Sequence, residues 1–297
     1  MEGWAAEAFQ GVKISYPSNP TAGECYDIHM NKTPQQPLIS IITCTFNCEK
    51  FLPQALASVE DQTYQNIEHI INDSYSTDST REIIEEYITQ NESKYPIKLI
   101  HSPPEGVAKA LNTATREASG DILHYLHSDV YYAKNNSLDK VAAYFMENPE
   151  LVWLTGKLIV EFKGKKIFLP NTLPLKMYPE KALTITNFVS HENTFVRRKT
   201  LLSHGGFNED KRYPVEYSLW LNIIRDSQPL IVDDQFTVFI IHSGSTSTGS
   251  VFKLSKALLR GVNTLRKEKI IPLVGYYQDH PVYDQYCKIA NKVRKVL

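Results

Sequence analysis

Between residues 38 and 129, short apolar runs alternate with segments of helical period, and this alternation constrains the fold more than any other feature. The runs are rich in β-branched side chains, as strands buried on both faces are. They read LISIITCTF, IEHIIND, IKLIHS and DILHYLHSD. Between the first two, Leu52, Leu56 and Val59 repeat at helical spacing. This pattern predicts an α/β fold in which helices flank a mostly parallel sheet with right-handed crossovers.

Polar residues and glycines mark the expected ends of several elements. Ser76, Thr77 and Asp78 are N-cap candidates for the helix after the second strand, and Asp78 is expected to cap it rather than touch a ligand. Gly120 is expected to close the helix in VAKALNTATREASG. Further along, KLIVEFKGKKIFLP alternates around Gly164 and predicts a hairpin. VEYSLWLNII predicts another helix.

The composition is that of a globular protein without a strong overall charge. The 297 residues are 42% hydrophobic, which is enough for a substantial core. Lys and Arg number 32 against 33 Asp and Glu, so no net field favours nucleic acid as a partner. The cysteines lack CxxC or disulfide-ladder spacing, and we find neither a signal-peptide pattern nor about 18 consecutive apolar residues. These features predict a cytoplasmic protein.

Changes in composition divide the chain into a central domain and two flanking segments. Residues 1–37 are rich in proline and polar residues and read as an irregular extension, and residues 38–250 form the predicted domain. Residues 251–297 hold ten Lys or Arg and three acids, a local net of 10 − 3 = +7. This basic, helix-patterned segment has two open interpretations: peripheral docking on the anionic inner face of a membrane, or a solvated helix pair packed on the domain.

Three polar clusters fall where strands of the expected sheet end. They span residues 43–47, 73–80 and 127–129. Each alone is typical of capping and turn residues, so Asp129 is either one end of a metal site or the cap of a turn. Because ligands of open α/β sheets bind at the carboxyl ends of the strands, the clusters together predict a ligand site at one edge.

Several stretches follow one another in a recognisable order over residues 37–250. They are PLISIITCTFN, INDSYSTDST, GVAKALN, ASGDILHYLHSDV, HENTFVRR, GGFNED and VEYSLWL. Their order and spacing resemble family-2 glycosyltransferases of the GT-A fold. The resemblance implies a Rossmann-like sheet flanked by helices, with residues 38–130 as the nucleotide-binding half, residues 131–250 as the acceptor half and a C-terminal helical extension. It also implies a nucleotide-sugar donor, expected to be UDP-linked, and a saccharide or lipid-linked acceptor.

The resemblance assigns nucleotide contacts to the ends of the first two strands and to the segment around residue 127. Asp73 matches the family's acid that holds the base or ribose, where a charge-assisted hydrogen bond contributes about 1.5–3 kcal/mol. A turn-stabilising role for Asp73 is the alternative. The other implied contacts to nucleotide or sugar are Thr43, Thr45, Asn47, His127, Ser128 and His191.

The sequence HSD at residues 127–129 resembles the family's DxD-like metal motif but departs from it. Family members usually have DSD or NSD, so Asp129 keeps the second acid and His127 replaces the first. The leaving diphosphate needs its charge neutralised, which implies Mg²⁺ or Mn²⁺. Imidazole suits Mg²⁺ poorly, so Asp129 is the expected ligand, and His242 is expected as a further metal ligand or phosphate contact.

Glu216 stands at the position of the family's catalytic aspartate in EDxDLWLR. An inverting transfer needs a base that takes the proton of the attacking acceptor hydroxyl, and a carboxylate can do this. The alternative is an acid placed at a helix N-terminus by the macrodipole. Ser218 cannot replace Glu216 as a base, the role of Glu192 stays open, and Trp220 is expected in the core.

These residues predict an inverting, metal-dependent hexosyl- or N-acetylhexosaminyltransferase of surface polysaccharide synthesis. The departures at His127, Val130 and Ser218 keep a second class open, a non-catalytic sugar-nucleotide-binding or scaffold protein of the same fold. A nucleotidyltransferase would have a Gly-rich basic loop after the first strand, and TCTFNCEK has no glycine.

Overall fold

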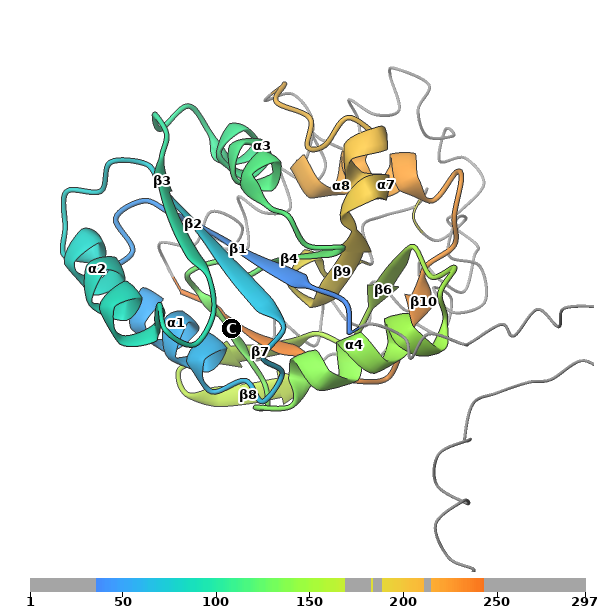
Figure 1. Cartoon of the computed structure of the whole chain (residues 1–297), viewed down its shortest axis with the longest axis horizontal. Coiled ribbons are helices and arrows are strands. Elements are labelled where there is room, and N and C mark those ends of the chain that lie inside the picture. The colour runs from blue at the N-terminus through green and yellow to red at the C-terminus, as the bar shows by residue number, and fades with distance from the viewer. Residues whose placement is uncertain (1–35, 169–182, 184–188, 211–214, 243–297) are drawn as a thin grey trace, which may run out of the picture. The chain divides into compact units, whose positions relative to one another are not determined.

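The computed structural model describes residues 36–168, 183, 189–210 and 215–242, which form an α/β fold (Figure 1). Its larger sheet has seven strands in the order β10-β6-β9-β4-β1-β2-β3. The strands are β1 (Ile39–Thr45), β2 (Ile67–Asp73), β3 (Ile97–His101), β4 (Ile122–Tyr125), β6 (Trp153–Thr155), β9 (Thr194–Arg197) and β10 (Leu230–Ile231). Pairings within β1–β4 are parallel, whereas β9 runs antiparallel to β4 and β6. The predicted mostly parallel sheet is confirmed.

Helices cover both faces of this sheet, and Figure 1 shows the two groups on opposite sides. One face packs on α1 (Leu52–Glu60), α2 (Thr80–Asn91) and α4 (Ser137–Glu147). The other packs on α3 (Val107–Glu117), α7 (Arg198–Ser203) and α8 (Val215–Ile223). Side chains of β1 divide between these cores, with Ile41 in the first and Ile42 in the second. This two-sided burial explains the β-branched runs of the sequence.

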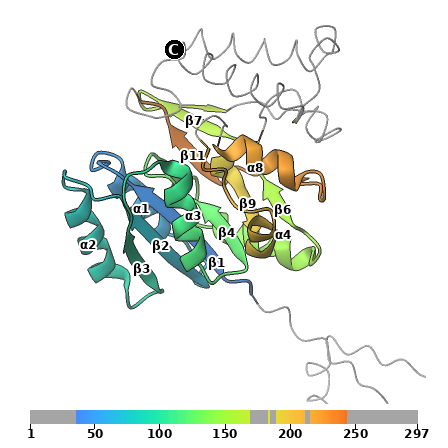
Figure 2. The ribbon, with the colours of Figure 1, turned by 90° about the horizontal axis from the view of Figure 1, so that it is seen from above.

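A second, four-stranded sheet has the order β5-β11-β7-β8, and Figure 2 shows β7 and β11 beside the main sheet. Its strands are β5 (Val130–Tyr132), β7 (Ile159–Phe162), β8 (Lys165–Phe168) and β11 (Thr237–Ile240). The predicted hairpin is confirmed: β7 and β8 are joined by Lys163 and Gly164, whose φ angles are 49° and 73°. A two-residue turn with both φ values positive matches the twist of the paired strands.

Two expected helix ends differ from the structure. Helix α2 begins at Thr80 with Ser79 as its N-cap, so the candidates Ser76 to Asp78 precede the helix. Helix α3 ends before Ala118, not at Gly120. A Cβ on Gly120 would lie 2.7 Å from the carbonyl oxygen of Leu38, so glycine is present because the backbones approach closely there.

Glu68 on β2 is buried with 8% of its surface exposed. Burial by itself would raise the pKa of its carboxyl, but hydrogen bonds from Ser40, Ser119 and Gly120 more than offset that effect and lower the pKa below its usual value. Because the folded-state pKa is depressed, the ionised side chain stabilises the fold above the unfolded pKa. This contribution is lost as the pH falls through the folded pKa.

Glu68→Gln is therefore expected to lower the free energy of unfolding at pH 7 by about 1–3 kcal/mol, with a smaller difference below the folded pKa of Glu68. Urea unfolding of both proteins across this pH range measures the effect. Glu117→Gln, at a carboxylate 40% exposed and paired with Lys98, is the matched control and should change little. A loss that is independent of pH would show that shape, not charge, matters at residue 68.

Candidate active site

The ends of β1 and β2 meet through a hydrogen-bonded carboxylate. Parallel register places Thr45 opposite Asp73, and the Thr45 hydroxyl donates to Asp73 Oδ1 at 2.9 Å. Ser76 donates twice, from its hydroxyl to Oδ1 at 2.6 Å and from its backbone N–H to Oδ2 at 3.0 Å. Asp73 is fully buried, and His101 Nδ1 lies 3.8 Å from Oδ2. The structure thus brings Thr45 and Asp73 together and gives Asp73 the turn-stabilising role in addition to any contact with a ligand.

The loops after β1 and β2 are tied to each other. Asn47, at a φ of 49°, donates its backbone N–H to Ser76 Oγ, and its side-chain oxygen accepts from the Thr77 N–H at 2.8 Å. Asp78 accepts from the backbone N–H of Thr80 and from that of Glu49, each at 3.1 Å. Asp78 therefore binds the first backbone N–H of α2 from the position before the N-cap Ser79, and is not itself the N-cap. These hydrogen bonds join the ends of β1 and β2 and the loops that follow them into one surface. We call this surface, formed by residues 45–49 and 73–80, the strand-end wall.

Thr43 does not reach this edge. Its hydroxyl lies 2.9 Å from His69 Nε2, and the chain of buried hydrogen bonds continues through Tyr87 to Tyr95. Burial lowers the pKa of His69 to about 3, so the imidazole is neutral. Because Thr43 lies two residues before the end of β1 and its hydroxyl is bonded to His69 in the core, the structure does not support the expected nucleotide contact through this side chain.

Two aromatic side chains that the sequence analysis did not single out lie at the same edge. Phe46, after β1, and Tyr75, after β2, are each 55% exposed. The Tyr75 ring stacks on His101 with centroids 5.8 Å apart. Their signal in the sequence was an aromatic residue within each of two polar clusters at strand ends.

The segment His127–Asp129 is a turn between β4 and β5, closed by the Val130 N–H donating to His127 O at 3.0 Å. Asp129 Oδ2 lies 3.3 Å from His242 Nε2, although 113 residues separate them in the chain. The imidazole of His242 stacks on Phe51 at 4.1 Å. Ser128 lies in the same turn, between His127 and Asp129. The structure therefore brings the two predicted metal ligands together.

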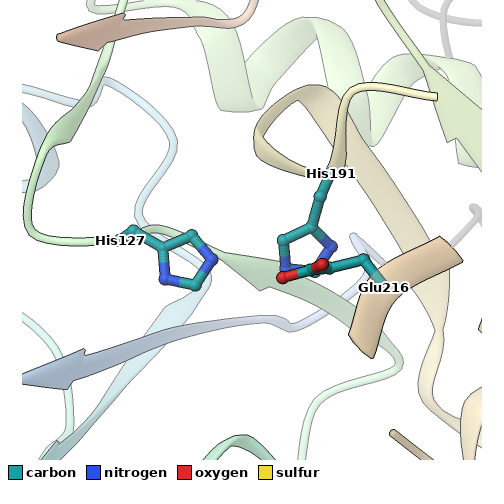
Figure 3. A group of neighbouring side chains, drawn as sticks. All are labelled: His127, His191 and Glu216. Atoms are coloured by element: carbon teal, nitrogen blue, oxygen red, sulfur yellow. The ribbon is translucent and has the colours of Figure 1, made fainter. Parts of the chain in front are cut away.

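A second group of side chains gathers His127, His191 and Glu216, with one potential ligand atom from each lying within 4.8 Å of the others (Figure 3). His127 comes from the β4–β5 turn, His191 begins the 3-10 helix η1 (His191–Asn193), and Glu216 lies in the first turn of α8. His127 and Glu216 are partly exposed, whereas His191 is 5% exposed. Residues far apart in the sequence thus share one site.

His191 is enclosed by aromatic rings. Tyr125 stacks on it with centroids 5.3 Å apart, and Phe207 and Trp220 lie at 5.7 and 5.8 Å. Neither ring nitrogen has a hydrogen-bond partner among the residues that the structure describes. Burial, followed by the nearby His127 and His124, holds the pKa of His191 well below its usual value, so the imidazole is neutral.

Two acids, Glu192 and Glu216, lie beside these imidazoles, and both are partly exposed. Burial raises the pKa of Glu192, the charge of Glu216 raises it further, and the Ser190 hydroxyl donates to Glu192 Oε2 at 2.9 Å. Glu216 presents its carboxylate to the space between the two imidazoles (Figure 3). Ser218 turns its hydroxyl back to the Val215 carbonyl, and Trp220 is fully buried against Trp153, as expected of a core residue.

Comparison with solved structures identifies the class of this fold. Residues of the chain superpose on TarS from S. aureus, solved with UDP-GlcNAc, with a TM-score of 0.60 at 19% identity over 78% of this chain and 70% of that one. The mannosyltransferase PcManGT from Pyrobaculum calidifontis, solved with GDP-Man and Mn²⁺, gives a TM-score of 0.59 at 19% identity, covering 78% and 65%. The fold is the GT-A fold of glycosyltransferases.

The family follows from sequence. The model of glycosyl transferase family 2 matches residues 40–204, more than half of the chain, so the protein belongs to that family. An uncharacterized glycosyltransferase of Haemophilus influenzae is 35% identical over 46% of this chain and 53% of its own length. The Escherichia coli protein named UDP-Glc:alpha-D-GlcNAc-diphosphoundecaprenol beta-1,3-glucosyltransferase WfaP is 29% identical over 77% of this chain and 86% of its own length.

The flanking segments stay outside this description. Residues 1–35 and 243–297 lie beyond the described part, so the predictions of an irregular extension and of a basic helical segment remain predictions. Among the described residues, no helix combines the length and apolar character that crossing a bilayer requires.

Proposed function

We propose that this protein is an inverting glycosyltransferase that moves a hexosyl or N-acetylhexosaminyl group from a UDP-linked donor to a hydroxyl of a saccharide or lipid-linked oligosaccharide in surface polysaccharide synthesis. One observation carries the proposal. Glu216, a partly exposed carboxylate, shares a site with His127, and His127 precedes by two residues the Asp129 that pairs with His242. The proposed base and the proposed cation-binding pair are therefore linked through the short turn that carries His127 and Asp129. The names of the Escherichia coli relative and of the UDP-GlcNAc complex of TarS support a UDP-linked donor.

Asp129 and His242 suit a divalent cation. Their facing atoms are 3.3 Å apart, close to the about 3 Å between neighbouring ligands of an octahedral ion with bond lengths of about 2.1 Å. One carboxylate with one imidazole suits Mn²⁺ better than Mg²⁺. When bound, such an ion neutralises the charge that develops on the leaving diphosphate. The chain's own contribution is to hold the two ligands at the ends of β4 and β11, where the second sheet fixes them.

Glu216 is the proposed base. The acceptor hydroxyl gives its proton to the carboxylate while its oxygen attacks the anomeric carbon, and the diphosphate leaves from the opposite face, so the product anomer is inverted. His191 cannot take this proton because burial depresses its pKa. Glu192 is a poorer candidate, since its Oε2 already accepts a hydrogen bond from the Ser190 hydroxyl.

The strand-end wall is the proposed nucleotide site. Thr45, Asn47 and Asp73 provide its polar groups, and the exposed rings of Phe46 and Tyr75 offer flat surfaces on which a nucleobase can stack. The basic segment 251–297 would hold the enzyme near an anionic membrane surface, where lipid-linked acceptors lie.

Asp73→Asn is expected to weaken UDP binding by about 1.5–3 kcal/mol, because an amide accepts a weaker hydrogen bond than a carboxylate. Titration calorimetry measures the change. Alanine is less informative there, since it would leave the donors of Thr45 and Ser76 unpaired in a buried position. Ser76→Ala, which loosens the loop while keeping the acid, and Thr43→Val, inside the buried network, are the controls. Unchanged affinity in Asp73→Asn would leave Asp73 with the turn role alone.

Asp129→Asn and His242→Gln are each expected to abolish the Mn²⁺ dependence of UDP binding, because each removes one of two protein ligands. A chelator added to the unmodified protein should have the same effect. His204→Gln, at an imidazole paired with Asp226 at 2.9 Å, is the control. UDP affinity that is equal with and without Mn²⁺ in the unmodified protein would refute the metal assignment.

Glu216→Gln is expected to lower the transfer rate about 10²–10⁴-fold with UDP binding preserved, because the amide cannot accept the proton. Rates with a matched acceptor and the anomeric configuration of the product, read by NMR, test both parts. Glu192→Gln is the control and should retain most of the activity. Full activity in Glu216→Gln would show that another residue is the base. If the unmodified protein binds nucleotide-sugars but transfers no sugar from any donor tested, the non-catalytic alternative would be favoured.

A further inference from the structure

A second group of potential metal ligands, formed by His127, His191 and Glu216, differs in composition from the Asp129–His242 pair. Two imidazoles and one carboxylate offer ligand atoms within 4.8 Å of one another, and Asp129 is not a member of the set. Figure 3 shows the Glu216 carboxylate and both rings directed toward one point. The three residues come from the β4–β5 turn, η1 and α8, so the arrangement is a product of the fold and not of local sequence.

The unsatisfied hydrogen-bonding groups of His191 are a second, independent indication that an ion or ligand binds here. The side chain is 5% exposed, and neither of its nitrogens has a partner among the described residues. Buried polar atoms of native proteins are almost always satisfied, and the exceptions point to a bound ion, water or ligand. The surrounding rings of Tyr125, Phe207 and Trp220 supply no acceptor in contact with it. The open side of the ring faces His127 and Glu216 (Figure 3).

We propose that these three side chains bind a borderline divalent cation of the Zn²⁺ type, at a site separate from the Asp129–His242 pair, and that the bound ion inhibits sugar transfer. Imidazole nitrogen suits Zn²⁺, Cu²⁺ or Ni²⁺, whereas Mg²⁺ takes oxygen ligands, so this set of ligands disfavours Mg²⁺. Three protein ligands with a fourth position open to water is a common arrangement for Zn²⁺.

The geometry requires a small adjustment of side chains. Tetrahedral Zn²⁺ with bond lengths of about 2.05 Å places its ligand atoms about 3.3 Å apart, so atoms now within 4.8 Å must approach by up to about 1.5 Å. His127 and Glu216 are partly exposed and can rotate, whereas His191 is held by its aromatic neighbours. The buried ligand is thus already oriented, and the two exposed ones close on the ion.

Inhibition follows from Glu216, and this step rests on the proposed function. A carboxylate that ligates a cation cannot also accept the proton of the acceptor hydroxyl. His127 creates the site, since the DSD or NSD sequence usual in the family would place an acid or amide there instead of an imidazole. The chain would therefore be more sensitive to Zn²⁺ than a protein with an acid at residue 127.

The test measures cation binding without any turnover. Co²⁺ is titrated into the full-length protein with Mg²⁺ in excess, and its visible absorption reports imidazole ligation in a site of low coordination number. Zn²⁺ should displace it, with affinity obtained by competition against a chromophoric chelator. His127→Gln, His191→Gln and Glu216→Gln should each weaken Zn²⁺ binding at least about tenfold, because loss of a direct ligand costs no less than loss of an outer-shell partner.

Asp129→Asn and His242→Gln are the matched controls, and both should keep the Co²⁺ absorption. If His191→Gln does not fold, His127→Gln, at a partly exposed turn, still tests the site. The proposal is overturned if the unmodified protein shows no imidazole-type absorption, if the three glutamine variants bind Zn²⁺ like the parent, or if Asp129→Asn loses the ion.

The inhibitory step has its own readout. Zn²⁺ at concentrations that fill the site should slow transfer, a stronger chelator should restore the rate, and His127→Asp should need at least about tenfold more Zn²⁺ for the same inhibition. Zn²⁺ that binds without slowing transfer would overturn the inhibitory step and the assignment of Glu216 together, while the cation site itself would stand on the absorption data.

Discussion

Strand β2 is buried along its whole length, yet it carries polar side chains on both faces, and the site depends on how these are satisfied. On one face, Glu68 accepts from Ser40, Ser119 and Gly120. On the other, Asp73 accepts from Thr45 and Ser76. Buried polar groups without partners are costly, so each bond fixes the register of β2 against its neighbours. The strand ends, and the loops that follow them, are placed by these bonds.

The second sheet brings together residues that the main sheet alone would leave apart. Strand β5 begins immediately after Asp129, β11 ends just before His242, and the two strands pair antiparallel. The Ile240 N–H donates to the Asp129 carbonyl at 2.8 Å, and this bond holds the two chain segments together beside the Asp129 and His242 side chains. The pairing of β5 with β11 therefore places Asp129 next to His242, the two proposed cation ligands.

Two of the departures from the family pattern, at residues 127 and 216, lie close together. His127 stands for an acid, Glu216 stands for an aspartate, and both meet at the neutral His191. Glutamate reaches one methylene farther than aspartate, so its carboxylate can approach the imidazoles from the first turn of α8. The substitutions at residues 127 and 216 thus bring potential ligand atoms within 4.8 Å of each other and of His191.

The sequence by itself determined the α/β class, the alternation of strands and helices up to residue 129, the hairpin at Gly164 and the family, because these depend on local periodicity and on motifs read along the chain. It also marked Asp73, Asp129 and Glu216 by residue type and position. Local pattern misplaced the end of α3, since Gly120 is required by contact with Leu38 and not by the helix. Thr43 and Thr45 point to the same face of β1, yet only the tertiary structure shows that Thr43 lies deeper, bonded to His69, while Thr45 reaches Asp73. The pairing of Asp129 with His242 and the meeting of His127, His191 and Glu216 were likewise decided by tertiary structure, because they depend on how separate elements pack, which no local pattern encodes.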